Sequence, residues 1–281
     1  MHRPAEYSLF VGTALVAALL SPAAATAVEF DISPEVAGFS ASSLTKLPEG
    51  PHPVRQDDNC STDIIVPTTA AGRYVEQRGW GVISETRLGR YQLVSFGGIF
   101  IPGTSGSCAI EQSNIGLFES DRLKAIVYTG AKTDRFIGQL HPMEDGSVRL
   151  WGGDFLQSAV ADLVVRAGKM VLRPLAAEDT ACNGTAFVPN IFDLPITKAR
   201  EKLQSRGWKP VPQALTADLS QQDDLQAIGV VEVEACSGTG FGFCSYVYQG
   251  AVATLLVTTA GELYQDQVPA VAWYDVTCNK P

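Results

Sequence analysis

The chain has 281 residues, of which 46% are hydrophobic. This length suits two domains or one large all-β domain with a substantial core. Its formal net charge is −9 at pH 7 and it contains no run of basic residues, so nucleic acid and anionic membrane surfaces are disfavoured as partners.

The first 27 residues have the features of a secretory signal peptide. A mostly apolar run from Tyr7 to Leu20 is followed by Ala25-Thr26-Ala27, which predicts cleavage before Val28. The run is shorter than the roughly 20 residues that a membrane-spanning helix needs, and no later stretch is apolar enough to span. The first cysteine is Cys60, far from the cleavage site, so no lipid anchor is expected. We expect an exported bacterial protein, periplasmic or secreted, without a transmembrane segment.

All six cysteines follow the predicted cleavage site, and an even number of cysteines in an exported protein predicts disulfide bonds. No pair has C-x-x-C spacing, and only His52 and His141 remain after cleavage, so no metal site is expected. Connectivity is not determined by sequence alone. The positions of the cysteines along the chain favour pairing Cys60 with Cys108, Cys182 with Cys278, and Cys236 with Cys244.

Residues 28–59 carry four prolines and little periodicity, which predicts an extended arm with one helical turn near Ala41–Leu44. From residue 60 to 178, short apolar and β-branched runs alternate with turn signals such as Asp145-Gly146 and Ala167-Gly168. This spacing predicts an all-β domain, either an antiparallel sandwich or a barrel. The expected strands include runs at 64–66, 74–86, 91–101, 123–128, 136–140, 148–151, 163–165 and 170–172.

Gly103–Ser107 resembles the nucleophile loop of trypsin-like serine peptidases, whose chemistry also requires a histidine base and an orienting acid. His52 lies too close upstream of Ser105 for that fold, and His141 lies downstream, in the wrong order. We therefore interpret the segment as a tight turn that places Cys108, and assign no catalytic residue. A glycosidase carboxylate pair needs no particular sequence spacing, so a hydrolase site in this domain remains an alternative.

The stretch after residue 188 predicts a short helix with one buried face. Ile196, Ala199 and Leu203 follow the i, i+3, i+7 pattern. Gly207 suits the left-handed position after the helix, and Trp208 is then placed to pack back on Leu203.

Residues 188–211 resemble a PASTA module. The resemblance rests on Val188-Pro189-Asn190, the Ala199-Arg200 pair followed by Leu203, and Gly207-Trp208. Asp193 stands where the family usually has glycine, and the strands after the helix depart from the usual module. The resemblance implies binding of cell-wall muropeptides or β-lactams. The alternative is a βα unit whose helix only covers a sheet.

Residues 179–281 predict a small α+β domain, with this helix packed on an antiparallel sheet. The glycines between Cys236 and Cys244 lack the spacing of a dinucleotide fingerprint, so no cofactor is expected. Phe241 and Phe243 lie in the same loop, and we predict that they form a binding surface held rigid by a disulfide. The alternative is that they pack into the core.

These features favour a non-enzymatic, exported envelope protein with a binding role, directed to peptidoglycan or to a protein partner. The alternatives are a secreted inhibitor or accessory factor, and a hydrolase with its site in the β domain. A Ser/His or acidic cluster that meets inside a pocket would favour the enzyme. Exposed aromatic residues on a disulfide-held loop would favour the binding protein.

Overall fold

The computed structural model describes residues 31–52, 60, 63–130, 133, 135–214, 220–237, 240–265 and 267–279. The predicted signal peptide lies outside these residues. The described chain is mainly β, and none of its sheets closes into a barrel. This confirms the mainly-β class and favours the sandwich over the barrel.

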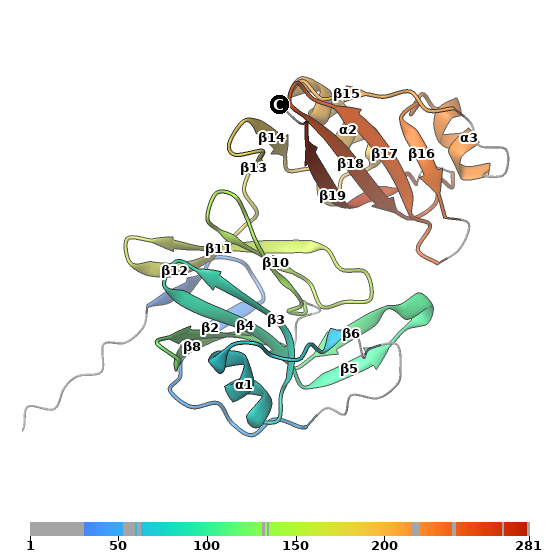
Figure 1. Cartoon of the computed structure of the whole chain (residues 1–281). Helices are drawn as coiled ribbons and strands as arrows, with labels where there is room; N and C mark the ends of the chain where they lie inside the picture. Colours follow the sequence, from blue (N-terminus) through green and yellow to red (C-terminus); the bar gives the residue numbers. More distant parts are fainter. Residues whose placement is uncertain are drawn as a thin grey trace, which may run out of the picture.

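The N-terminal half is a sandwich of two five-stranded sheets (Figure 1). The first has the order β2 (Phe39–Ser43), β8 (Arg122–Thr129), β7 (Asn114–Glu119), β4 (Tyr91–Gly97), β3 (Gly81–Leu88). The second has the order β1 (Ile32–Pro34), β12 (Lys169–Arg173), β11 (Ala159–Arg166), β10 (Val148–Trp151), β9 (Leu140–Pro142). Leu93 and Ile115 of the first sheet share one buried cluster with Leu150 and Leu163 of the second. The main core therefore lies between the sheets.

The helix α1 (Ala70–Gln77) covers the other face of the first sheet, where Val75 packs in a second cluster with Val94 and Phe96. The predicted run at 74–86 does hold a strand, β3 (Gly81–Leu88), but its first residues, up to Gln77, belong to this helix. The Thr69 hydroxyl caps the helix by accepting a hydrogen bond from the Gly72 N–H at 3.0 Å. That cap supports helix at this point, so the strand begins only at β3.

Part of the predicted arm belongs to the sandwich. β1 pairs parallel with β12, and β2 pairs antiparallel with β8. The helical turn expected near Ala41–Leu44 is wrong, because residues Phe39 to Ser43 form β2 and both Phe39 and Ala41 pack against the main core. The pairing with β8 satisfies the backbone groups that a helical turn would otherwise have satisfied.

Two predicted turns are confirmed. Gly146 adopts φ 80° in the β9–β10 connection, and the Asp145 carboxylate accepts from the Ser147 N–H at 2.9 Å. Ala167 and Gly168, both with positive φ, join β11 to β12. By contrast, the run predicted at 91–101 is not one strand. β4 ends at Gly97, and the chain continues into a separate hairpin of β5 (Ile99–Pro102) and β6 (Cys108–Glu111).

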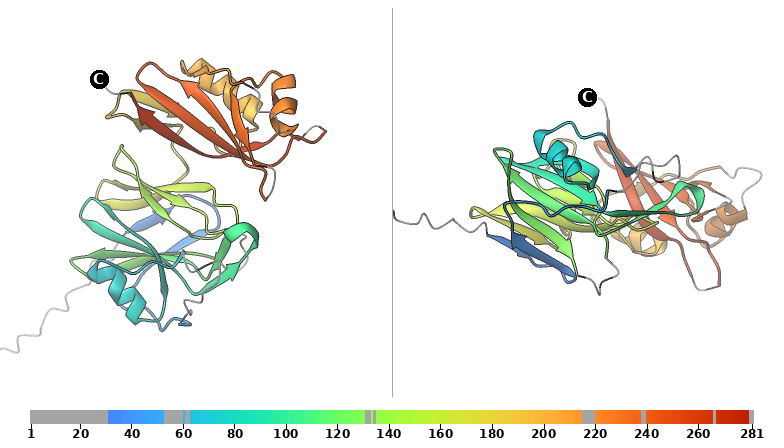
Figure 2. Two further views of the ribbon diagram at one scale, coloured as in Figure 1. Left: turned by 45° about the vertical axis from the view of Figure 1, so that its right-hand side comes forward. Right: turned by 90° about the horizontal axis from the view of Figure 1, so that it is seen from below.

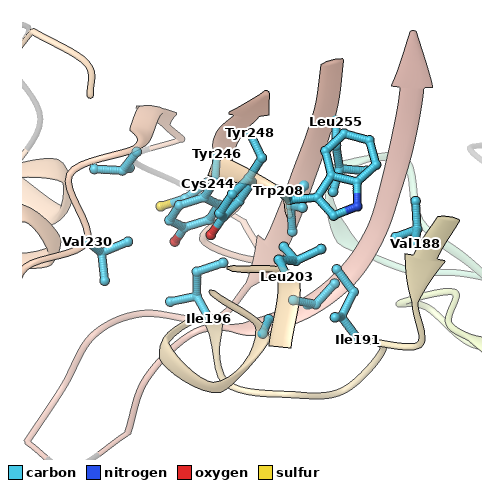
Figure 3. Packing of buried hydrophobic residues seen from close by; sticks show 14 of the residues in the cluster. Val188, Ile191, Ile196, Leu203, Trp208, Val230, Cys244, Tyr246, Tyr248 and Leu255 are labelled. Atoms are coloured by element: carbon cyan, nitrogen blue, oxygen red, sulfur yellow. The ribbon is translucent and has the colours of Figure 1, made fainter. Parts of the chain in front are cut away.

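Within its described residues, the C-terminal half contains a two-stranded and a five-stranded sheet with two helices. Its elements are β13 (Glu178–Ala181), β14 (Ala186–Pro189), α2 (Ile196–Ser205), β15 (Lys209–Pro210), α3 (Ser220–Ala227), β16 (Val233–Cys236), β17 (Cys244–Gln249), β18 (Ala253–Ala260) and β19 (Ala270–Cys278). The five-stranded sheet has the order β15-β17-β18-β19, with β16 also paired to β17. Figure 3 shows its core, in which α2 contributes Ile196 and Leu203 beneath Tyr246 and Tyr248.

The predicted helix and its end are confirmed. Ile196, Ala199 and Leu203 are fully buried, and Gly207 takes φ 86°. The Trp208 N–H donates to the Leu203 carbonyl at 3.1 Å, and the indole is buried. This is the Schellman-type ending that Gly207 permits.

The cores of the two halves are separate. Among the described residues, the C-terminal cluster contains nothing before Ala181, and the two N-terminal clusters contain nothing after Leu172. Both views in Figure 2 show the sandwich and the C-terminal sheet as neighbouring bodies. The disulfides join Cys60 to Cys108, Cys182 to Cys278, and Cys236 to Cys244, the pairs that position favours.

Candidate functional site

A buried polar cluster joins the two halves. Arg149 of β10 donates to Asp162 of β11 at 2.9 Å and to Asp179 of β13 at 2.7 Å. The Tyr274 hydroxyl of β19 donates to the same Asp179 carboxylate. Burial by itself would lower the pKa of Arg149, but hydrogen bonds and charges from Asp179 and Asp162 outweigh it and raise that pKa. The guanidinium therefore stays charged and holds segments of both halves together.

Aromatic rings reinforce this junction. Phe192 stacks on Tyr274, with ring centroids 5.1 Å apart, and meets Trp151 edge-on at 5.7 Å. The Arg149 guanidinium lies 5.4 Å from the centre of the Phe192 ring. Together, these contacts fix the end of β10 beside β19.

A cleft of about 690 Å³ opens beside the junction, with residues from both halves in its wall. Volumes of this size are typical of ligand sites, which occur preferentially between domains. The N-terminal half contributes Asp63, Gly106, Ser107, Cys108, His141, Trp151, Phe155, Leu156 and Gln157. The C-terminal half contributes Ser237, Gly240, Phe241, Phe243, Trp273, Tyr274 and Asp275.

Aromatic side chains dominate the wall. Phe243 lies between Phe241 and Trp273, with centroid distances of 5.6 and 4.9 Å. From the other half come Trp151 and Phe155, and Phe155 is 40% exposed. Rings that stay partly exposed and gather in one concave surface are characteristic of binding sites rather than of a core.

Phe241 and Phe243 are held by backbone hydrogen bonds next to a disulfide. Cys236 and Cys244 lie directly opposite each other on β16 and β17 and are disulfide-bonded. The Ser237 N–H donates to the Phe243 carbonyl at 2.7 Å, and the Ser237 hydroxyl accepts from the Phe243 N–H at 3.0 Å. Gly261 donates to the Phe241 carbonyl at 2.7 Å. Both phenylalanines are half-buried, line the cleft and lie outside the C-terminal core cluster.

The charge of the wall is negative. Asp63 and Asp275 line the cleft, and no lysine or arginine does so among the described residues. Burial raises the pKa of Asp63 and lowers the pKa of His141. At neutral pH the histidine is therefore uncharged, and the two carboxylates determine the local potential.

The side chain of Ser105, the serine of the peptidase-like loop, lies outside what the structure describes, and the described side chains do not assemble a serine peptidase site. Ser107 and His141 both line the cleft, but the Ser107 hydroxyl donates to the Thr104 carbonyl at 2.8 Å. His141 Nε2 lies 3.0 Å from the Gln139 amide oxygen. His52 does not line the cleft. It lies beside Glu49, and its backbone N–H donates to the Gly79 carbonyl. The described residues also contain no group of three or more His, Cys, Asp or Glu placed to hold a metal ion.

Sequence reasoning identified Phe241 and Phe243 but missed most of the wall. Trp151 lies in β10, and Trp273 and Asp275 lie in β19, and each occupies an ordinary strand position that does not by itself indicate a site. One local signal was available: Trp273-Tyr274-Asp275 places an indole and a carboxylate two residues apart, and so on one face of a strand.

Comparison with known protein families, with curated proteins and with solved structures gives no match to this chain. Across the part of the chain that the structure describes, no helix combines the length and apolar character needed to cross a membrane.

Proposed function

We propose that this chain is an exported, non-enzymatic binding protein whose ligand occupies the aromatic cleft. The observation that carries the proposal is the convergence of Trp151 and Phe155 with Phe243 and Trp273 on one concave surface. A ligand in this cleft would touch both halves of the protein. The buried Arg149 cluster would keep the site pre-organised, which reduces the entropy lost on binding.

Export is supported by the predicted leader and by the disulfides. Three disulfide bonds are typical of an oxidising compartment outside the cytoplasm. A periplasmic or secreted bacterial protein at the cell envelope is the location that these features favour.

Peptidoglycan is the ligand that we propose, on the basis of the PASTA-like segment. Asp193, which replaces the family's usual glycine, takes φ 59°, a left-handed conformation that glycine favours and aspartate tolerates. Val188, Leu203 and Trp208 from the motif are all buried in the core. The motif therefore supports the fold of the C-terminal half, while the cleft supplies the contact surface. The apolar faces of sugar rings suit its aromatic wall.

The test is co-sedimentation of residues 28–281, produced in an oxidising compartment, with purified peptidoglycan. We expect saturable binding that weakens about tenfold in Trp273→Ala and in Phe243→Ala, as for central aromatic contacts. Phe187→Ala is the matched control, because Phe187 is 46% exposed and does not line the cleft. No saturable binding by the disulfide-intact protein would reject peptidoglycan and direct the search to a protein partner, the inhibitor or accessory role. Equal loss in all three variants would reject the cleft.

A hydrolase is the second candidate, because Asp63 and Asp275 reach the same cleft from opposite halves. Burial raises the pKa of Asp63, as a general acid requires. Prolonged incubation with peptidoglycan followed by mass spectrometry of soluble products would decide between the two. Soluble products that disappear in Asp275→Asn would establish the hydrolase. Peptidoglycan that stays intact would favour the non-enzymatic binding protein.

A further inference from the structure

We infer that the cleft selects a ligand carrying an ammonium group, presented against its aromatic wall. This rests on the proposed function and specifies it: the group recognised would be a free amine on the peptide portion of peptidoglycan.

The charges of the cleft wall have one sign. Both formal charges in the described wall, Asp63 and Asp275, are negative, and the chain as a whole carries −9. Arg149, beside the cleft, is already bound by Asp162 and Asp179. The wall therefore has no cation to offer an anionic ligand, and its potential attracts a positive one.

Both carboxylates lack a cationic partner among the residues that the structure describes. Asp63 is half-buried, and Asp275 is exposed on β19. Neither forms an ion pair or a side-chain hydrogen bond with a described residue. The half-buried Asp63 carboxylate is partly desolvated and costly without a partner, and a bound ammonium group would relieve that cost. Consistent with this, burial is the sole cause of the raised pKa of Asp63.

On β19 an indole lies beside a carboxylate. Trp273 and Asp275 are two residues apart on β19, opposite Thr258 and Leu256 of β18, so both lie on the sheet face away from the core. Alternate residues on a strand are roughly 7 Å apart. An ammonium group between them would contact the carboxylate and the electron-rich face of the ring together. Phe243, 4.9 Å from Trp273, would enclose the methylene groups that carry the amine.

The test compares purified peptidoglycan with the same material after its free amines have been acetylated. Acetylation removes the positive charge and leaves the glycan intact. We expect at least about tenfold weaker binding to the acetylated material, and about tenfold weaker binding of Asp275→Asn to the untreated material. Glu201→Gln is the control, because it removes an exposed carboxylate on α2, away from the cleft.

Nα-acetyl-lysine amide and its Nε-acetylated form supply a second readout, by quenching of tryptophan fluorescence. Selective binding of the free amine, lost in Asp63→Asn and Asp275→Asn, supports the inference. Equal binding of native and acetylated peptidoglycan would overturn the inference while the proposed function stands. Binding of the lysine probe without any binding of peptidoglycan would overturn the cell-wall assignment and favour a lysine-bearing segment of a protein partner.

Discussion

Arg149 on β10 and Asp179 on β13 form a buried ion pair across the junction between the two halves, with Nη2 2.7 Å from Oδ1. Their side chains are 3% and 9% exposed. The same guanidinium binds Asp162, and the same carboxylate accepts from Tyr274. One polar cluster therefore orders strands from both halves, and the aromatic cleft lies directly beside it.

Removal of the arginine should destabilise the protein strongly. Arg149→Ala would leave Asp162 and Asp179 buried without a cation, and we expect the free energy of unfolding to fall by about 3–5 kcal/mol. Urea unfolding monitored by circular dichroism measures this. Glu201→Gln, which breaks the exposed pair with Lys198, should change it by less than about 1 kcal/mol. A loss below about 1 kcal/mol for Arg149→Ala would show that the cluster contributes little to stability.

Stability should fall steeply above about pH 10. Burial is the main cause of the raised pKa values of Tyr246, Tyr248 and Tyr274; Glu232 adds to the shift of Tyr248 and Asp179 to that of Tyr274. Above the ordinary tyrosine pKa of about 10, the unfolded chain loses these protons while the folded chain retains them. Each tyrosine should therefore lower the free energy of unfolding by up to about 1.4 kcal/mol per pH unit.

Urea unfolding at several pH values between 9 and about 11.5 tests the alkaline prediction. Tyr246→Phe should flatten the alkaline slope by the contribution of one group, because it removes only the hydroxyl that lies 3.2 Å from Thr259 Oγ1. An alkaline slope that is identical in the wild type and in Tyr246→Phe would contradict the assignment.

The two C-terminal disulfides should differ in their effects. In the loop-entropy model, replacing Cys182 and Cys278 by serine costs about 4–5 kcal/mol, against about 2–3 kcal/mol for Cys236 and Cys244. The reason is their sequence separations of 96 and 8 residues. The shorter loop carries Phe241 and Phe243, so its loss should also weaken peptidoglycan binding. Unfolding midpoints and co-sedimentation of both double variants measure the two effects, and a reversed order of stabilities would contradict the loop-entropy account.

Binding of the lysine probe should weaken as the pH falls. Burial raises the pKa of Asp63, so this carboxylate takes up a proton at a higher pH than an ordinary aspartate and then no longer attracts an ammonium group. The other titratable groups in the wall are Asp275, His141 and Tyr274. Burial lowers the pKa of His141, and the Tyr274 hydroxyl is engaged by Asp179. Fluorescence titrations at pH 4.5 to 7.5 should show this loss, with a smaller pH effect in Asp63→Asn. An unchanged pH profile in that variant would assign the effect to another group.

Turns and helix ends could be predicted from the sequence where residues within the same short segment determine the backbone conformation. The end of α2 at Gly207 and the turn at Asp145-Gly146 follow from left-handed backbone positions and nearby side chains. The strand in place of a helical turn at Phe39–Ser43 did not follow, because the hydrogen-bond partner is β8, more than 80 residues away. The Thr69 cap of α1 is also a local signal and could have predicted a helix. The apolar run that continues into β3 favoured a strand prediction instead.

By itself, the sequence predicted an export signal, and it determined the even set of cysteines, the mainly-β class and the helix that begins at Ile196, because these depend on composition and short-range periodicity. Only the tertiary structure decided that Trp151 and Asp63 share a cleft with Trp273 and Asp275. These residues occupy unremarkable positions in separate segments. They become one site because the buried Arg149–Asp179 pair and the rings around Phe192 fix one half against the other.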